Sequence, residues 1–279
     1  MAVSKELKAL VDQMPEPDDR DMYTGDMDKE KIEKAVAEMC RGGQASVVGL
    51  IDMLGEPGSA ENVKPHYALH CLVNHVLIAG DRGARITVAE TLAGELSGDR
   101  PKHVKAFLCQ ELQWAGGREA VAALAALLED ADLVEPAAIA LVAIRTGAAE
   151  AFRAALPKAK GKCRLNVVEG LGAVADADSA ATLREALDDP DAEVRLAAGW
   201  GLARLGDAAS ADFLLEAANC EPGWERVQAT KHCLVLAEKL SATGEKDLAR
   251  RVYQRLCDSR RDDEQYVRQA AEKALAAGR

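Results

Sequence analysis

Aromatic side chains are scarce in this sequence: Phe, Tyr and Trp together make up only 4% of its 279 residues. The core must therefore be filled mainly by Ala, Leu and Val, which suits closely packed helices better than a sheet sandwich. No segment alternates apolar and polar residues over any length, as half-buried strands do. No apolar run approaches the roughly 18 residues of a membrane-spanning helix. We expect neither a sheet nor contact with a membrane.

An excess of positive charge and closely paired cysteines are also missing. The chain has 35 basic and 46 acidic residues, a formal net charge of −11. Binding to a phosphate backbone needs a dense basic surface, so we expect no nucleic-acid partner. The seven Cys residues are widely spaced and contain no C-x-x-C pair. Together with an N-terminal segment that has no apolar leader, they indicate reduced thiols in a cytoplasmic protein.

Recognisable catalytic and cofactor motifs are absent as well. There is no G-x-x-x-x-G-K-[ST] phosphate loop, no G-x-S-x-G nucleophile turn and no H-E-x-x-H metal motif. His66 and His70 have the i,i+4 spacing of metal ligands, but no third ligand is evident beside them. We therefore predict satisfied interior histidines, with no metal, no cofactor and no catalytic residue.

What the sequence does contain is a repeat. Residues 163–187 align without a gap on residues 194–218, an offset of 31 that places Gly170 on Gly201. Further copies begin at Val104, Val63 and Val267, the one at Val63 being looser. Self-similarity with a period of about 30 residues predicts a helical solenoid, in which each repeat packs mainly on its neighbours.

The pattern within one copy explains why it is rich in small residues. When Val194 is numbered zero, positions 0, +4, +7, +8 and +11 share one helical face. Small residues at +4 and +7 let adjacent backbones approach, and Leu at +8 and +11 fills the remaining space. We expect the Asp189–Pro190 pair to provide the helix N-cap. The corresponding helices should stop at Gly116, Gly147 and Gly206.

The segment "DDPDAEVRLAAGWGLARLGD" and its copies resemble HEAT repeats, particularly the short HEAT-like form of bilin lyases. The resemblance covers about residues 44–279. It implies that an Asp six residues before an Arg or Lys links consecutive repeats in a charged ladder. The pairs that keep both members are Asp99/Lys105, Asp189/Arg195 and Asp262/Arg268. Arg164, Lys64 and Gln228 lack the Asp, so we expect the ladder to break there.

The predicted fold is all-α, a right-handed α-α superhelix made of about six to seven HEAT-like helix pairs. We assign residues 29–279 to the solenoid and residues 1–28 to an N-terminal helix and acidic linker. Leu7, Leu10, Val11 and Met14 form one stripe of that helix, and Asp28 is a candidate N-cap for the next. These helices should cover the open first repeat, because solenoid ends need a cap. The alternative is an arm that docks on a partner.

In the HEAT resemblance, the helices that begin at the "VR" positions line the concave side, and positions near +2, +5, +6 and +9 face solvent. They carry a mixed row that suits a protein partner better than a phosphate or a metal. Trp200 is either a binding anchor or a filler between repeats. The candidate partner-binding residues are Gln110, Gln113, Glu169, Trp200, His232 and Lys273.

These observations predict a non-catalytic scaffold or adaptor that binds a protein partner on its concave face. The alternative implied by the resemblance is a bilin-lyase-type enzyme or accessory subunit. A nucleic-acid-binding HEAT-like protein is a further alternative, which the acidic balance disfavours.

Overall fold

The computed structural model describes residues 3–17, 23, 27–260 and 264–277, and the only regular secondary structure in those ranges is helical. This confirms the predicted all-α class. The chain divides into two compact units, Met1–Ala148 and Ala149–Arg279. Among the described helices, none is both long enough and apolar enough to cross a lipid bilayer.

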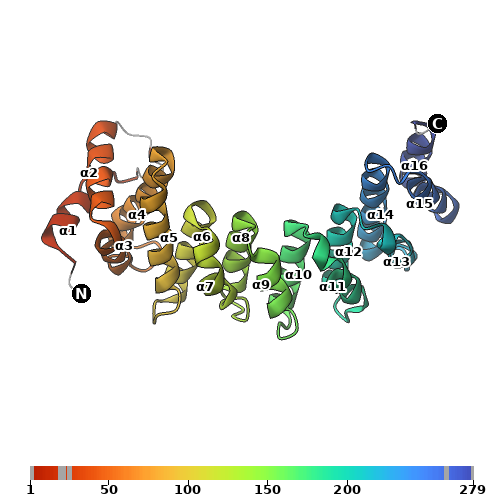
Figure 1. Cartoon of the computed structure of the whole chain (residues 1–279), viewed down its shortest axis with the longest axis horizontal. Helices are drawn as coiled ribbons and strands as arrows, with labels where there is room; N and C mark the ends of the chain where they lie inside the picture. The colour runs from red at the N-terminus through yellow and green to blue at the C-terminus, as the bar shows by residue number, and fades with distance from the viewer. Residues whose placement is uncertain (1–2, 18–22, 24–26, 261–263, 278–279) are drawn as a thin grey trace. The chain divides into compact units, whose positions relative to one another are not determined.

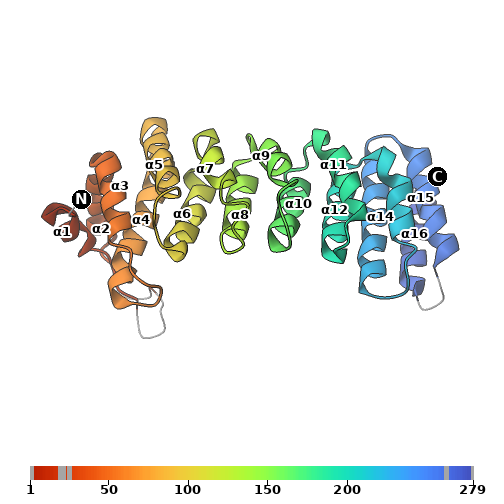
Figure 2. The same ribbon diagram turned by 90° about the horizontal axis from the view of Figure 1, so that it is seen from below.

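The first unit stacks its helices in two rows (Figures 1 and 2). Helices α2, α4, α6 and α8 form one row, and α3, α5 and α7 form the other. Each even-numbered helix from α4 onward also packs against the odd-numbered helix before it, which gives three pairs. The helices are α1 (Lys5–Val11), α2 (Lys29–Arg41), α3 (Gly43–Asp52), α4 (Ala60–Ala79), α5 (Arg82–Glu95), α6 (Lys102–Ala115), η1 (Arg118–Ala120), α7 (Val121–Ala125) and α8 (Val134–Ile144).

The first two helices lie against the start of this stack. The side chain of Asp28 accepts a hydrogen bond from the Lys31 N–H at 3.0 Å, which confirms the predicted N-cap of α2. Leu7 and Val11 of α1 are buried, and Leu7 packs over Gly49 of α3. Residues 18–22 and 24–26 of the acidic segment between α1 and α2 lie outside the described residues, and the domain boundary at residue 28 stays a prediction.

The second unit repeats the same arrangement, with α10, α12 and α14 in consecutive contact. Its four pairs bring the total in the described residues to seven, within the predicted range. The helices are α9 (Ala148–Ala155, whose first residue belongs to the first unit), α10 (Lys162–Val174), η2 (Ala177–Ser179), α11 (Ala180–Glu185), η3 (Ala186–Asp188), α12 (Ala192–Leu205), η4 (Ala208–Ser210), α13 (Ala211–Ala217), α14 (Trp224–Ala242), α15 (Lys246–Ser259) and α16 (Gln265–Ala277).

Small residues set the distance between these helices, as predicted. A Cβ built on Gly201 would lie 2.9 Å from the Cα of Gly172, so the backbones of α12 and α10 touch at this point. A Cβ on Gly170 would overlap the ring of Phe152 in α9, a side chain that is fully buried. The period-31 glycines are therefore required by close packing, because any side chain would force a helix or a buried ring to move.

Two predicted helix ends are confirmed and two are not. Gly116 directly follows α6, and Gly206 ends α12 in the left-handed conformation with φ of 70°. The end predicted at Gly147 is wrong, because α8 already stops at Ile144. The N-cap predicted at Asp189 is also wrong. Asp191 caps α12 instead, and its carboxylate accepts the Glu193 N–H at 2.9 Å.

Asp189 is not a cap because its buried carboxylate is already occupied. It accepts a hydrogen bond from the backbone N–H of Asp191 at 3.0 Å, and it forms an ion pair with the Arg164 guanidinium. Burial alone would raise the pKa of Asp189, but these two partners outweigh it and lower that pKa. The break in the ladder predicted at Arg164 is therefore wrong, since this residue reaches the Asp of the following repeat.

The next two arginines of the ladder also pair with acidic residues of the following repeat, rather than with an Asp six residues before them. Arg195 donates to the backbone carbonyl of Asp189 at 2.8 Å, while its guanidinium pairs with Glu225 of the next repeat at 2.7 Å. Arg226 pairs in turn with Glu264 at 2.9 Å. Within the described part of the chain, no hydrogen bond or ion pair joins Asp99 to Lys105. Asp262 lies outside the described residues, so its pairing with Arg268 stays a prediction.

A second ladder, not predicted from the sequence, links the other helix row of this unit. Arg153 of α9 forms an ion pair with Asp176, and its guanidinium donates to the Ser179 hydroxyl at 2.8 Å. Exactly one period of 31 residues later, Arg184 of α11 pairs with Asp207. The repeated Arg and Asp positions could have revealed this ladder, because both recur with the same offset as the glycines.

Candidate functional site

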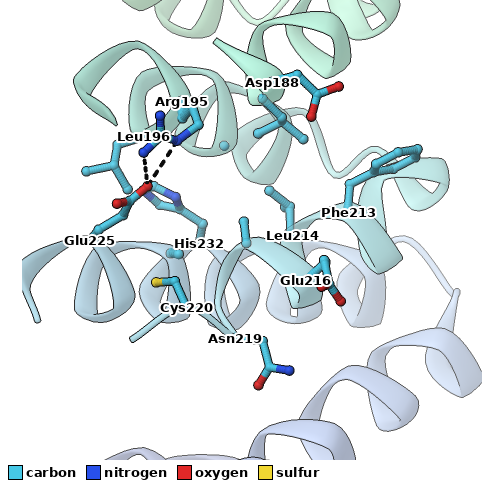
Figure 3. Close-up of a pocket in the computed structure, with 14 residues that line it drawn as sticks. Asp188, Arg195, Leu196, Phe213, Leu214, Glu216, Asn219, Cys220, Glu225 and His232 are labelled. Carbon is cyan, nitrogen blue, oxygen red and sulfur yellow. Dashed lines mark hydrogen bonds and ion pairs between the residues drawn. The ribbon is translucent and has the colours of Figure 1, made fainter. Parts of the chain in front are cut away.

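A cavity of about 410 Å³ opens in the second unit between α12, α13, α14 and the loop that joins the last two (Figure 3). We call it the α12–α14 pocket. Leu196, Phe213 and Leu214 contribute apolar wall, and Asn219 and Cys220 of the loop contribute polar atoms. Phe213 is also 55% exposed. The pocket therefore offers both an apolar surface and hydrogen-bonding groups to a ligand.

The pocket forms beside a connection that is longer than the corresponding one in the preceding copy. Val194 and Val227 are 33 residues apart, whereas Cys163 and Val194 are 31 apart. The longer connection carries Pro222 and Gly223, which precede α14. Gly223 has an extended φ of 164° at the N-cap of this helix.

One side of the pocket holds a closed ion pair. The Arg195 guanidinium of α12 meets Glu225 of α14, with Nε and Nη2 at 3.0 and 2.7 Å from the same carboxylate oxygen (Figure 3). Two further carboxylates, Asp188 and Glu216, line the pocket and are exposed. Within the described residues, neither of them has a hydrogen bond or an ion pair. The lining therefore carries three negative charges against one positive charge.

His232 of α14 is the most unusual group in the pocket. It is 8% exposed and makes no hydrogen bond to any described residue. Its ring fits because α12 has a glycine opposite: a Cβ built on Gly199 would lie 2.9 Å from Nδ1. Burial, and secondarily the charge of Lys231, lowers the pKa of His232 to about 4. At neutral pH the ring is uncharged, so one nitrogen accepts a hydrogen bond and the other donates one.

Comparison with known families adds a decisive observation. Residues 149–234, which include most of the pocket, match the family model described as HEAT repeats. This segment is therefore similar to HEAT repeats. Among curated proteins, no sequence matches the chain.

Solved structures show where else the HEAT-like fold occurs. The karyopherin Kap121p bound to the extreme C-terminus of the protein phosphatase Cdc14p has a TM-score of 0.53 at 12% identity, over 87% of this chain and 30% of that one. Kap121p bound to Nup53p has a TM-score of 0.51 at 11% identity, over 100% and 36%. The chain thus spans about a third of the length of Kap121p. At these identities the likeness concerns the fold alone.

A third similar structure is the complex of CpcE and CpcF of phycocyanin lyase from Nostoc sp. PCC7120. It is 20% identical over 82% of this chain and 94% of that chain, with a TM-score of 0.43.

Of the predicted binding residues, only His232 lines the α12–α14 pocket. The expectation that its position, +5, faces solvent is wrong, because α14 packs that side of the helix against α12 and α13. Gln110 and Gln113 lie on α6 of the first unit, exposed and half-buried respectively. Glu169 of α10 and Lys273 of α16 are exposed and do not line the pocket. Their role in binding stays a prediction.

Trp200 lies half-buried between two inner helices of the HEAT repeats. A Cβ built on Gly172 would lie 2.9 Å from Cε3 of the indole, so the ring fills the space that this glycine leaves. The Arg204 guanidinium lies 4.6 Å from the ring centroid, a cation–π distance. These contacts favour the packing alternative for Trp200. Its role as a binding anchor stays a prediction.

A polar cluster in the first unit was missed by sequence reasoning. Glu111 of α6 is fully buried, and both its carboxylate oxygens lie near Nδ1 of His70 in α4, at 3.0 and 3.2 Å. This hydrogen bond raises the pKa of His70, and its effect is larger than the opposing effect of burial, which would lower that pKa. The His70 side chain is satisfied as predicted but is 44% exposed rather than interior. The available signal was Glu111 itself, since it occupies position +7, where the copies at Cys163, Val194 and Val267 have Gly or Ala.

The neighbouring His66 has a different environment. It is half-buried, and its ring stacks on Phe107 with centroids 3.6 Å apart. Burial, the largest effect, lowers its pKa. Across the described ranges of the chain, no group of three or more His, Cys, Asp or Glu side chains is arranged to hold a metal ion.

Proposed function

We propose that this protein is a non-catalytic scaffold that binds a segment of a protein partner, and that the α12–α14 pocket of its HEAT repeats is a contact site. The observation that carries the proposal is the pocket itself, an open cavity of about 410 Å³ walled by three helices. Its mixture of apolar wall and hydrogen-bonding groups matches what a peptide presents. Protein binding is also the use of this fold in the two Kap121p structures.

The chemistry of the lining supports binding rather than catalysis. A general acid or base works best when its pKa lies near the operating pH, whereas that of His232 is about 4. Burial raises the pKa of Cys220, the one thiol in the lining, so this group remains a thiol rather than a reactive thiolate. Glu225 is held by Arg195 and is not available as a base.

Site-specific photo-crosslinking tests the proposal. A photoreactive phenylalanine analogue replaces Phe213, which lines the pocket, or Tyr266, an exposed aromatic residue of α16. After irradiation in lysate of the native organism, we expect a protein adduct from position 213 and not from position 266.

A pocket-filling substitution provides the control. Ala217→Trp should abolish the adduct, because Ala217 is exposed and lines the pocket. Ala181→Trp, at an exposed alanine of α11 outside the pocket, should leave it unchanged. Equal adduct yields from the two tryptophan variants would refute binding at this site.

A further inference from the structure

We propose that the group received by the α12–α14 pocket is a lysine or arginine side chain from an extended segment of the partner. This inference rests on the proposed scaffold function and names the chemistry that the pocket selects. Three observations carry it: the uncompensated charge of the lining, the His232 side chain that lines the pocket without a hydrogen-bond partner among the described residues, and the apolar part of the wall.

The charge of the lining favours a cation. Arg195 is already neutralised by Glu225, with which it shares two hydrogen bonds. Asp188 and Glu216 have no cation partner among the described residues, so two of the lining residues carry an uncompensated negative charge. A phosphate or a carboxylate ligand would be repelled by them. A cationic side chain would be attracted by the field of both.

His232 supplies the second observation. More than nine-tenths of the residue is buried, and its imidazole has no hydrogen-bond partner among the described residues. Its ring nitrogens keep accessible surface only within the cavity that the residue lines, so a ligand that enters the cavity can hydrogen-bond to them. A neutral imidazole nitrogen accepts from an ammonium or guanidinium N–H. An apolar ligand could not satisfy it and would also desolvate the two carboxylates.

The apolar wall completes the fit. Lysine and arginine combine a charged tip with an aliphatic stem, and the stem packs on apolar surface while the tip stays polar. Leu196 and Leu214 offer such a surface beside His232, and Phe213 offers an exposed aromatic ring (Figure 3). An aromatic face also attracts a cation directly.

Titration with capped amino acids tests this selection without knowledge of the partner. The probes are the N-acetyl methylamides of lysine, arginine, norleucine and glutamate, and the readout is the ¹⁵N-labelled His232 ring signal in NMR spectra of the full chain. We expect the lysine and arginine probes to shift this signal with saturation, and the shift to weaken with added salt. Norleucine should give at most a tenth of their affinity, and glutamate no shift. Equal shifts from norleucine, or binding of glutamate, would overturn the proposal.

Charge-matched variants separate the pocket from the net charge of the chain. The double variant Asp188→Asn/Glu216→Gln should weaken the lysine probe at least fivefold. Asp178→Asn/Glu238→Gln removes the same two charges from exposed positions of the same unit outside the pocket, and should change the affinity less than twofold. Equal weakening by both double variants would refute recognition by the pocket.

The crosslinking experiment distinguishes this inference from the scaffold proposal. If the position-213 adduct persists in Asp188→Asn/Glu216→Gln at full yield, the partner binds the pocket without a cationic side chain and only the present inference fails. If no adduct forms at position 213 in the unaltered chain, the scaffold proposal fails as well.

Discussion

Replacing Gly172 with Ala should destabilise the second unit, although the same change is favourable in most helices. Ala is better than Gly in a helix interior by about 1 kcal/mol. At Gly172, however, the new Cβ would lie 2.9 Å from the Gly201 Cα and 2.9 Å from Cε3 of Trp200. The first of these atoms belongs to a backbone, so α12 must shift as a whole for the methyl group to fit.

The structure allows an estimate of the balance. Adding a methyl group to a fully packed contact costs about 1–3 kcal/mol. After the propensity gain is subtracted, we expect a net loss of about 1 kcal/mol in the free energy of unfolding. Gly94 of α5 is the matched control, because a Cβ built there meets nothing within 4 Å. Gly94→Ala should therefore stabilise its unit, by up to about 1 kcal/mol.

Urea unfolding followed by circular dichroism and Trp fluorescence measures both effects. The two units can unfold separately, so hydrogen exchange in α10 and α12 should be compared with that in α5. We expect faster exchange in α10 and α12 for Gly172→Ala and slower exchange in α5 for Gly94→Ala. If Gly172→Ala raises the urea midpoint as much as Gly94→Ala does, the two backbones are not in contact and our account of the small-residue repeat is wrong.

Three further substitutions test individual side chains. Because the pKa of His232 falls from its ordinary value to about 4 on folding, the unfolded chain binds this proton first. Stability should therefore fall as the pH drops from about 6.5 towards 4, by about 2 kcal/mol at pH 5, and urea midpoints should show that His232→Gln loses this component. Glu111→Gln should lower the pKa of His70 in an NMR titration, because the hydrogen bond that His70 donates to the Glu111 carboxylate is the largest cause of the raised value; an unchanged His70 pKa would contradict the pairing. Arg164→Met should cost about 2 kcal/mol in urea unfolding, since it leaves the buried Asp189 carboxylate without its ion pair; a loss below about 0.5 kcal/mol would show that the ladder is dispensable there.

The sequence predicts the fold because small residues that recur with the repeat indicate positions where helices pack closely. Gly170 and Gly201 recur 31 residues apart at positions where a helix meets its neighbour, and the structure places both at close contacts. A period reports which face of a helix is buried, and that is enough for an α-solenoid.

The period does not report which neighbour covers a given position, and the predicted partner of Asp189 and the predicted exposure of His232 were wrong for that reason. The Asp189 carboxylate pairs with Arg164 of the preceding repeat rather than with Arg195 of its own, because the helix-to-helix offset decides which guanidinium reaches it. His232 was expected at the surface but is buried where α14 packs against α12 and α13. Both outcomes depend on the angle between packed helices, and the local sequence pattern does not predict this angle.

Glu111 and His232 are buried polar residues at positions where the repeat pattern changes. Only His232 has no hydrogen-bond partner among the described residues. Glu111 stands where three other copies have Gly or Ala, and His70 of the adjacent helix satisfies it. His232 stands at position +5, which Gly199 occupies in the preceding copy, and no described residue satisfies it. A structural role explains Glu111 completely, because its hydrogen bonds are made within the fold. The same reasoning leaves the His232 imidazole without a partner, and this is why we place the ligand at the α12–α14 pocket rather than at the histidine cluster of the first unit.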